Sequence, residues 1–268
     1  MKMDRGGERD GRQNDAPGED FTDDAFLGGR LQALQPRKGF RAGLDTVFLA
    51  AAIAAGEGAR VLELGAGAGI AALCLALRTG ASVMGIEREP WLANLACENA
   101  RRNGLAERVA FACADALNYR TDRPFDVVMA NPPYNDARHG TPTPIAKKRG
   151  SVLHEGGGIA AWVKAAHENL KPGGAAYFIY RADRGEDLLR ALATDFAQVL
   201  WLPLMPREGE QPRRVIIRAR MAPAAPLRRV EGFVLHGQIT KYTPQAEAIL
   251  RHGAALDLET GQTGSAIT

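Results

Sequence analysis

The fold is decided by Arg60-Val-Leu-Glu-Leu-Gly-Ala-Gly-Ala-Gly69, a short apolar run that leads into three closely spaced glycines. The run predicts a buried strand, and residues 70–79 predict a helix that begins directly after the last glycine. Gly65, Gly67 and Gly69 allow a tight turn and let a ligand approach the backbone at the start of that helix. A plain strand–helix turn would use the same residues, so a ligand site depends on what surrounds them.

Outward from this stretch, short apolar runs alternate with helical patterns. Further strands are expected at residues 82–86, 109–114, 125–130 and 175–180, and helices at residues 90–103 and 159–170. This alternation predicts an α/β fold with a Rossmann-like, doubly wound, mostly parallel sheet. Two more β-like runs, at residues 198–204 and 214–220, are separated by a turn-rich segment. We therefore expect a seven-stranded sheet that ends in an antiparallel hairpin.

The composition is that of an ordinary globular protein. The chain has 268 residues, of which 46% are hydrophobic and 24% charged, and its net charge is +3. No apolar run reaches the roughly 18 residues of a membrane helix, and the N-terminus lacks the apolar core of a secretory signal. The three cysteines and five histidines show no metal-ligand spacing. We expect a cytoplasmic protein with no membrane segment and no metal site.

The composition changes along the chain and divides it into four predicted segments. Residues 1–20 are charged and glycine-containing and predict a disordered leader, and residues 21–221 hold the main domain. Beyond a Pro- and Ala-rich linker, residues 222–258 predict a small C-terminal appendage. Residues 259–268 predict a disordered tail.

Two acidic residues follow the next two strands and support a ligand at the glycine-rich turn. Glu87 stands 20 residues past Gly67, where an acid can bind ribose hydroxyls. Asp115 follows the third strand and can accept a hydrogen bond from an adenine amine, although a turn aspartate would look the same. Dinucleotide enzymes share this layout, but Ile70 stands where their third glycine is expected. Glu63 would repel a pyrophosphate and attract a cation, which favours S-adenosylmethionine.

The fourth strand is followed by Asn131-Pro132-Pro133-Tyr134, which indicates an acceptor site. The lone pair of a planar amine is delocalised, and two hydrogen-bond acceptors aimed at the amine hydrogens can direct it toward a methyl donor. The side-chain oxygen of Asn131 and the carbonyl of Pro132 can act as these two acceptors. Pro133 favours an extended Pro132, and Tyr134 offers a face on which a flat base can stack. A proline-rich loop with Asn as turn former explains each residue but not their joint position.

With these motifs the chain resembles the class I S-adenosylmethionine-dependent methyltransferases, over residues 21–221. The Asn-Pro-Pro-Tyr run is similar to that of their N-methylating members. The resemblance implies that the enzyme transfers a methyl group from this donor to an sp² nitrogen through an amine site at residues 131–134. It also implies donor contacts at Glu63, Gly65, Gly67, Gly69, Glu87 and Asp115.

The flanking sequence resembles one group within this family. Phe21-Thr-Asp-Asp-Ala-Phe-Leu-Gly-Gly-Arg30, Gln35-Pro36 and Gly39-Phe-Arg-Ala-Gly-Leu-Asp45 are similar to the N-terminal segment of bacterial tRNA1(Val) (adenine(37)-N6)-methyltransferases. That resemblance implies a tRNA adenosine as acceptor and a short hairpin over residues 21–36. It also places Asp45 as the N-cap of a helix that begins at Thr46.

A nucleic-acid partner also agrees with basic residues late in the chain. Lys147 and Lys148 follow the acceptor motif, and Arg213 and Arg214 follow the turn-rich segment. Each pair by itself is equally compatible with an ordinary solvated surface. We interpret the four residues together as phosphate ligands of an RNA too large for the pocket.

Three alternatives stay open at this point. The Asn-Pro-Pro-Tyr motif also occurs in enzymes that methylate a protein glutamine amide, although the short leader here differs from their helical N-terminal domain. A base of ribosomal RNA is another acceptor. Outside enzymes, the chain could be an RNA-binding protein without turnover, which the intact Asn131 and Tyr134 disfavour. The oligomeric state does not follow from the sequence.

Overall fold

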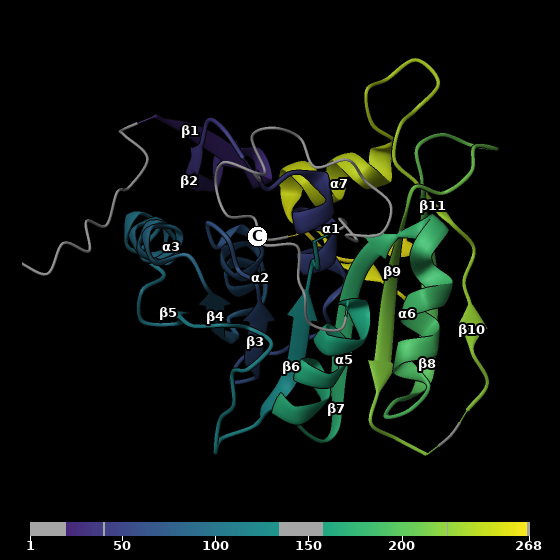
Figure 1. The fold of residues 1–268 in the computed structure, drawn as a ribbon. Helices are drawn as coiled ribbons and strands as arrows, with labels where there is room; N and C mark the ends of the chain where they lie inside the picture. Colours follow the sequence, from purple (N-terminus) through teal and green to yellow (C-terminus); the bar gives the residue numbers. More distant parts are fainter. Residues whose placement is uncertain (1–19, 40, 134–157, 224, 267–268) are drawn as a thin grey trace, which may run out of the picture.

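The protein is built around one large twisted sheet (Figure 1). The computed structural model describes residues 20–39, 41–133, 158–223 and 225–266. The order of the sheet is β10-β8-β9-β7-β6-β3-β4-β5, and β11 also pairs with β8. Its central strands are β3 (Arg60–Leu64), β4 (Ser82–Glu87), β5 (Val109–Cys113), β6 (Phe125–Ala130) and β7 (Leu170–Arg181). These five are mutually parallel.

The predicted hairpin closes the parallel part of the sheet. β8 (Ala197–Met205) and β9 (Arg214–Arg220) are antiparallel, and β9 lies between β8 and β7. The prediction of a mostly parallel sheet with a terminal hairpin is confirmed. The predicted count of seven strands is wrong, because β10 (Arg228–Arg229) and β11 (Phe233–Val234) add to the far side of β8. Each pairs over two residues only, too short a run to be recognised in the sequence.

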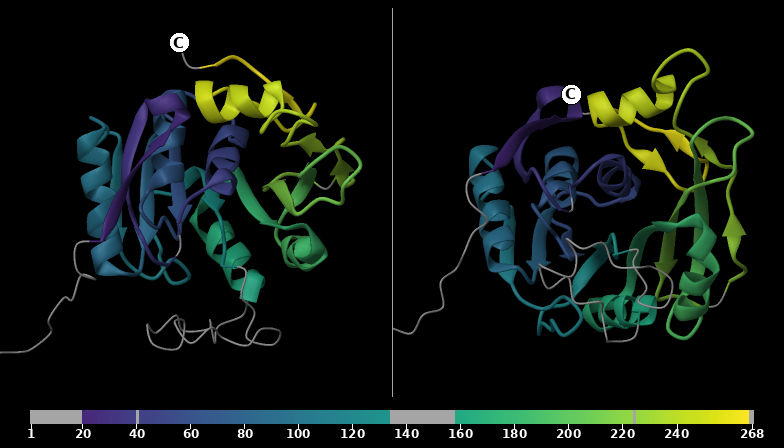
Figure 2. Two further views of the ribbon diagram at one scale, coloured as in Figure 1. Left: turned by 90° about the horizontal axis from the view of Figure 1, so that it is seen from above. Right: turned by 45° about the horizontal axis from the view of Figure 1, so that its top comes forward.

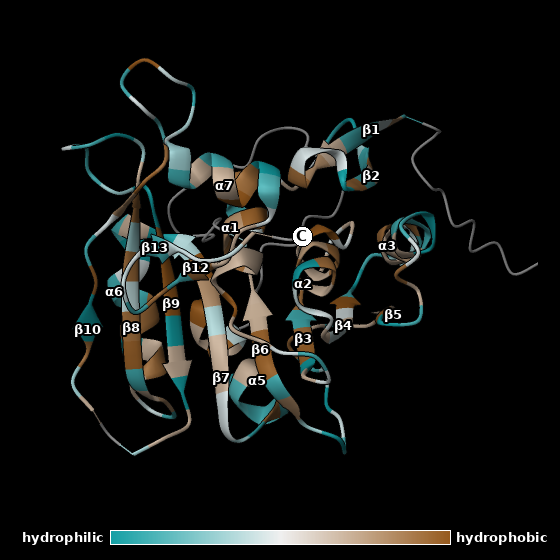
Figure 3. Ribbon diagram, turned by 180° about the vertical axis from the view of Figure 1, so that it is seen from behind, coloured by the Kyte–Doolittle hydropathy of each residue, from teal (hydrophilic) through white to brown (hydrophobic). Residues whose placement is uncertain are grey.

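Helices cover both faces of the sheet, as the two views of Figure 2 show. One apolar core lies under α1 (Leu44–Ala52), α2 (Ile70–Thr79) and α7 (Pro244–His252), and another under α5 (Gly158–Asn169) and α6 (Gly185–Leu192). α3 (Pro90–Arg102) packs against β5 at the other edge. Four consecutive residues of β3, from Val61 to Leu64, are buried. A strand covered on both faces is largely apolar, and apolar residues predominate in β6 in Figure 3, whereas β3 also contains the buried Glu63.

The expected N-terminal hairpin is present. β1 (Phe21–Phe26) and β2 (Leu31–Pro36) pair antiparallel from Phe21 opposite Pro36 to Phe26 opposite Leu31. The free edge of β2 faces α3, where two asparagines one helical turn apart bind its backbone. The Asn99 side chain bonds both backbone groups of Leu34 at 2.8 and 3.0 Å, and Asn103 bonds both groups of Gln32 at 3.0 and 2.7 Å. The hairpin is thus fixed to the domain by two side-chain amides.

The prediction that Asp45 is the N-cap of the first helix is wrong. α1 begins at Leu44 with Gly43 as its N-cap, so Asp45 lies within the first turn. Its carboxylate instead accepts a hydrogen bond from Nε of Arg214 at 2.6 Å. The sequence could not reveal this partner, which lies 169 residues away.

The C-terminal segment packs against the main domain. Helix α7 begins after Thr243, whose hydroxyl accepts the N–H of Ala246 at 3.1 Å, and ends at Gly253 in a left-handed conformation. The expected disordered tail from residue 259 differs from the structure, since β12 (Leu256–Asp257) pairs with β13 (Gln262–Thr263). The residues expected as a disordered leader lie, apart from residue 20, outside the described residues.

No helix among the described residues is both long and apolar enough to span a bilayer. In the same part of the chain, no three metal-ligating side chains come together in a group that could hold a metal ion.

Candidate active site

The glycine-rich turn after β3 is hydrogen-bonded to the end of the neighbouring strand β4. The N–H groups of Gly65 and Ala66 both donate to the carbonyl of Ile86, each at 2.9 Å. All three predicted glycines have positive φ, with values of 73° at Gly65, 57° at Gly67 and 84° at Gly69. A side chain at Gly69 would meet Phe111 at 2.5 Å, whereas nothing lies within 4 Å of the equivalent position at Gly67. The turn is therefore packed at its end and open at its middle.

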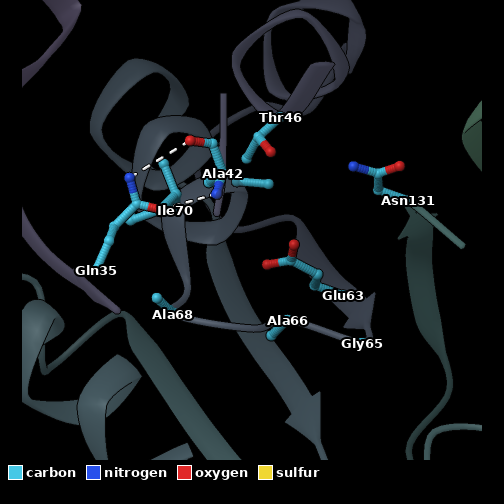
Figure 4. Close-up of a pocket in the computed structure, with 10 residues that line it drawn as sticks. Gln35, Ala42, Thr46, Glu63, Gly65, Ala66, Ala68, Ile70 and Asn131 are labelled. Atoms are coloured by element: carbon cyan, nitrogen blue, oxygen red, sulfur yellow. Dashed lines mark hydrogen bonds between the residues drawn. The ribbon is translucent and has the colours of Figure 1, made fainter. Parts of the chain in front are cut away.

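A cleft opens in front of this turn (Figure 4). It collects residues from the ends of β3 and β6, the starts of α1 and α2, and the N-terminal hairpin. Its lining residues are Gln35, Ala42, Thr46, Glu63, Gly65, Ala66, Ala68, Ile70, Ala71 and Asn131. The cleft lies at the carboxyl ends of the parallel strands, where ligands bind in open α/β sheets.

Glu63 is the buried acid of the cleft. It is 5% exposed, and its carboxylate accepts one hydrogen bond from the described residues, from the N–H of Ala72 at 3.0 Å. Burial raises the pKa of Glu63 to about 8, opposed by that hydrogen bond and reinforced by the nearby Glu87. A buried carboxylate with spare acceptor positions on a cleft fits a cationic amine, which would favour its ionised form. The residues present therefore suit a donor that carries positive charge.

Glu87 and Asp115 stand at the ends of the neighbouring strands, as predicted. One oxygen of Glu87 accepts the N–H of Gly67 at 2.9 Å and the other accepts the N–H of Glu89 at 2.9 Å. Glu87 thus shapes the glycine-rich turn directly. Asp115 is exposed and accepts from the N–H of Leu117 at 3.0 Å and from the Asn118 amide at 2.6 Å. Its carboxylate is oriented by this local turn at the same sheet edge.

The acceptor motif begins at the cleft. Asn131 follows β6 directly and lines the cleft with Glu63 and Gly65, and Figure 4 shows its side-chain amide on the side opposite the hairpin. Pro132 is buried and Pro133 exposed. Tyr134 lies outside the described residues.

Three residues of this region were not predicted. Gln35 is 2% exposed, and its side chain accepts the N–H of Ala42 at 2.7 Å, which holds the segment before α1 against the cleft. Asn99 donates to the carbonyl of Ala68 at 2.9 Å and so joins the hairpin to the glycine-rich turn. Thr46 brings a hydroxyl from α1 to the cleft wall (Figure 4). All three come from elements that are distant in the chain, and no local pattern marks them.

The predicted phosphate ligands divide into three cases. Arg213 is exposed at the end of the β8–β9 connection. Arg214 is bound to the carboxylate of Asp45, which offsets its charge. Lys147 and Lys148 lie outside the described residues.

Comparison with known proteins identifies the family. Residues 55–211 match the family described as "Methyltransferase domain". The match covers more than half of the chain, and the chain belongs to this family. It is an S-adenosylmethionine-dependent methyltransferase, and the fold described above is that of such an enzyme.

Two similar proteins from bacteria have names that are more specific than that of the family. The chain is 28% identical over 200 residues to the tRNA1(Val) (adenine(37)-N6)-methyltransferase of Actinobacillus succinogenes, covering 70% of this chain and 80% of the relative. It is 29% identical over 203 residues to the enzyme of the same name from Enterobacter sp. strain 638, covering 72% of this chain and 80% of the relative. A crystal structure of a predicted O-methyltransferase from Agrobacterium tumefaciens superposes with a TM-score of 0.63 at 24% identity, covering 76% of this chain and 94% of that one. That likeness shows the fold alone.

The buried Glu63 predicts how donor affinity depends on pH. Below about pH 8 the carboxyl keeps its proton in the free enzyme, so binding of a cationic amine must first release that proton. Affinity for S-adenosylhomocysteine, which carries the same amine, should rise by up to about tenfold per pH unit toward pH 8. Calorimetry between pH 6 and 8.5 measures this change, and Glu63→Gln should remove it. If the affinity of the wild-type protein did not depend on pH, Glu63 would not bind the amine of the ligand.

The raised pKa of Glu63 also makes the stability of the ligand-free protein depend on pH, in the opposite direction. In the unfolded chain Glu63 loses its proton near the ordinary glutamate pKa of 4.5, whereas the folded state keeps it to about pH 8. Between these values the folded state binds more protons, so the free energy of unfolding contributed by Glu63 falls as pH rises. Glu63→Gln should flatten that fall in denaturation experiments without ligand.

Proposed function

We propose that this methyltransferase transfers the methyl group of S-adenosylmethionine to N6 of an adenosine in tRNA. The observation that carries the proposal is Asn131, which lies at the end of β6 in the same cleft as Glu63 and Gly65. An amide oxygen beside a site for a cationic donor suits an acceptor amine. The names of the curated relatives support adenine in tRNA as the acceptor.

On the donor side, the proposal assigns roles to six residues. S-adenosylmethionine supplies a methyl group on a positively charged sulfonium. Glu63 would hold the amine of the methionine part, and the open backbone at Gly67 leaves room for close approach. Glu87, already fixed to the turn, would accept from the ribose hydroxyls, and Asp115 from the adenine amine. Gly65 and Gly69 give the turn its shape.

On the acceptor side, positioning and electrostatics carry the reaction. The side-chain oxygen of Asn131 and the carbonyl of Pro132 would accept the two N–H groups of the adenine amine and direct its lone pair toward the methyl group. Pro133 restricts Pro132 to an extended conformation, and Tyr134 would stack on the base. No strong general base is needed before transfer, because the sulfonium charge is dispersed as the new bond forms.

The proposal includes the organisation of the chain. Residues 21–221 would form the methyltransferase domain, with the segment from residue 222 as an appendage to the same sheet. The enzyme would work in the cytoplasm, where its substrate is made.

Nucleoside analysis tests the acceptor. Unmodified tRNA is incubated with the enzyme and isotope-labelled S-adenosylmethionine, then digested and examined by mass spectrometry. We expect label in N6-methyladenosine. Label in a protein glutamine or in another nucleoside would overturn the assignment, and RNA from a deletion strain identifies the position that loses its methyl group.

Salt dependence tests the contribution of phosphate contacts. Affinity for unmodified tRNA should fall steeply with salt, and each phosphate contact contributes about −0.7 to −0.9 to the slope of log K against log salt concentration. Arg213→Glu should flatten the slope by about one contact and leave donor affinity unchanged. A wild-type affinity that does not depend on salt would contradict an RNA substrate and favour the protein-amide alternative.

A further inference from the structure

A second surface lies on the sheet edge that carries the cleft. β8 is parallel to β6 and β11 is parallel to β8, so all three end at the same edge of the sheet. Residues 235–243, which follow β11, are here called the edge loop. The edge loop and the β8–β9 connection project from the sheet side by side (Figures 1 and 2). The N–H of His236 donates to the carbonyl of Pro206 at 2.9 Å, which joins the two segments.

The edge loop is held in one conformation by its own contacts. Nδ1 of His236 lies 2.5 Å from the carbonyl oxygen of Lys241, and the hydroxyl of Thr240 donates to the carbonyl of Tyr242 at 2.7 Å. At its base the N–H of Thr243 donates to the carbonyl of Leu235 at 3.0 Å. A loop fixed in this way loses little conformational entropy when it binds a partner.

What the edge loop presents is aromatic, apolar and basic. The rings of His236 and Tyr242 are stacked with centroids 5.3 Å apart, and Nζ of Lys241 lies 5.3 Å from the Tyr242 centroid. Ile239 at the tip is 100% exposed. The sequence has no acidic residue between Glu231 and Glu247, and Lys241 has no carboxylate partner among the described residues. A cation beside aromatic faces suits a nucleic acid, and the acids of the adjacent β8–β9 connection are Glu208 and Glu210.

The cleft and the edge loop are connected by a continuous series of contacts. Thr46 in the cleft wall follows Asp45, which binds Arg214 at the start of β9. Arg214 pairs with Leu204 of β8, and the β8–β9 connection between them contacts the edge loop. Four strand spacings of about 4.8 Å separate the ends of β6 and β11, which gives roughly 19 Å. A nucleoside cannot span that distance, but a folded RNA whose target base enters the cleft can.

We propose that the edge loop is a second contact for the RNA substrate, with Lys241 as a phosphate ligand and Ile239 in contact with a sugar or base. This inference rests on the proposed tRNA methylation and adds the surface that distinguishes a whole tRNA from its isolated nucleoside.

The test compares the edge loop with a matched charge reversal on the opposite side of the sheet. Lys241→Glu and Ile239→Asp change exposed side chains and should leave folding intact, while Arg123→Glu alters an exposed cation before β6, at the amino ends of the strands. Binding of unmodified tRNA is measured at several salt concentrations, together with binding of S-adenosylhomocysteine. Lys241→Glu should weaken tRNA binding about fivefold to tenfold and reduce the salt slope by about one contact.

The expected result has three further parts. Ile239→Asp should weaken tRNA binding at every salt concentration, Arg123→Glu should bind as the wild type does, and all variants should bind the donor product normally. If the wild type binds and methylates tRNA and both loop variants match it, the edge-loop proposal is overturned while the proposed function stands. If the wild type fails to bind or methylate tRNA, the proposed function is wrong, and the edge-loop proposal, which rests on it, is wrong as well.

Discussion

Asn131→Ala should lower the turnover number about 10²–10³-fold, because loss of one preorganised polar contact to the reacting group costs that much in comparable sites. Affinity for S-adenosylhomocysteine should stay within about twofold, since the proposed function assigns Asn131 to the acceptor and other residues to the donor. Single-turnover rates with saturating tRNA, combined with calorimetry, separate the two effects.

Asn131→Asp is the matched variant for this prediction. It keeps a side-chain oxygen at the same position and should retain more activity than the alanine variant, while its added negative charge next to Glu63 should alter the pH profile. Near-normal turnover in Asn131→Ala would exclude the amine-orienting role. Equal loss of turnover and donor affinity would instead indicate collapse of the cleft.

Gly69→Ala should destabilise the protein by roughly 2–5 kcal/mol, combining left-handed backbone strain with overpacking. Gly69 has φ of +84°, and a Cβ there would lie 2.5 Å from Phe111 and 3.1 Å from Ala96. Urea unfolding followed by circular dichroism measures the change. Donor affinity of the remaining folded fraction should also fall, because the turn would have to move.

Gly58→Ala provides the control, since Gly58 has φ of +81° with no atom within 4 Å of the Cβ position. It carries the backbone strain without the collision and should cost only about 1–2 kcal/mol. Similar losses in both variants would show that packing of the glycine-rich turn against Phe111 contributes nothing to stability.

The sequence predicted those parts of the molecule in which local pattern and position agree. Buried parallel strands such as β3 are largely apolar, and the carboxyl ends of such strands meet at one edge. For this reason the sequence predicts that Glu63 and Asn131, 68 residues apart, lie in one site, and the structure places both on one cleft. The strand–helix alternation is equally local, and it gave the order of the central elements.

The remaining features depend on contacts between distant segments. The pair of Asp45 with Arg214 and the clamp of Gln35 on Ala42 arise only when the chain is folded. The local sequence around Asp45 therefore predicts that this residue caps α1, whereas the N-cap is Gly43. The two short strands β10 and β11 owe their conformation to the free edge of β8, which no local propensity encodes.

The asparagine pair on α3 has a consequence for association between molecules. An exposed strand edge is a template on which another chain can add a strand. On β2 that template is occupied, because Asn99 and Asn103 bind the outward backbone groups of Leu34 and Gln32. A helix thereby completes hydrogen bonding that a further strand would otherwise supply, and the β2 edge of the hairpin is closed to the addition of a strand from another molecule.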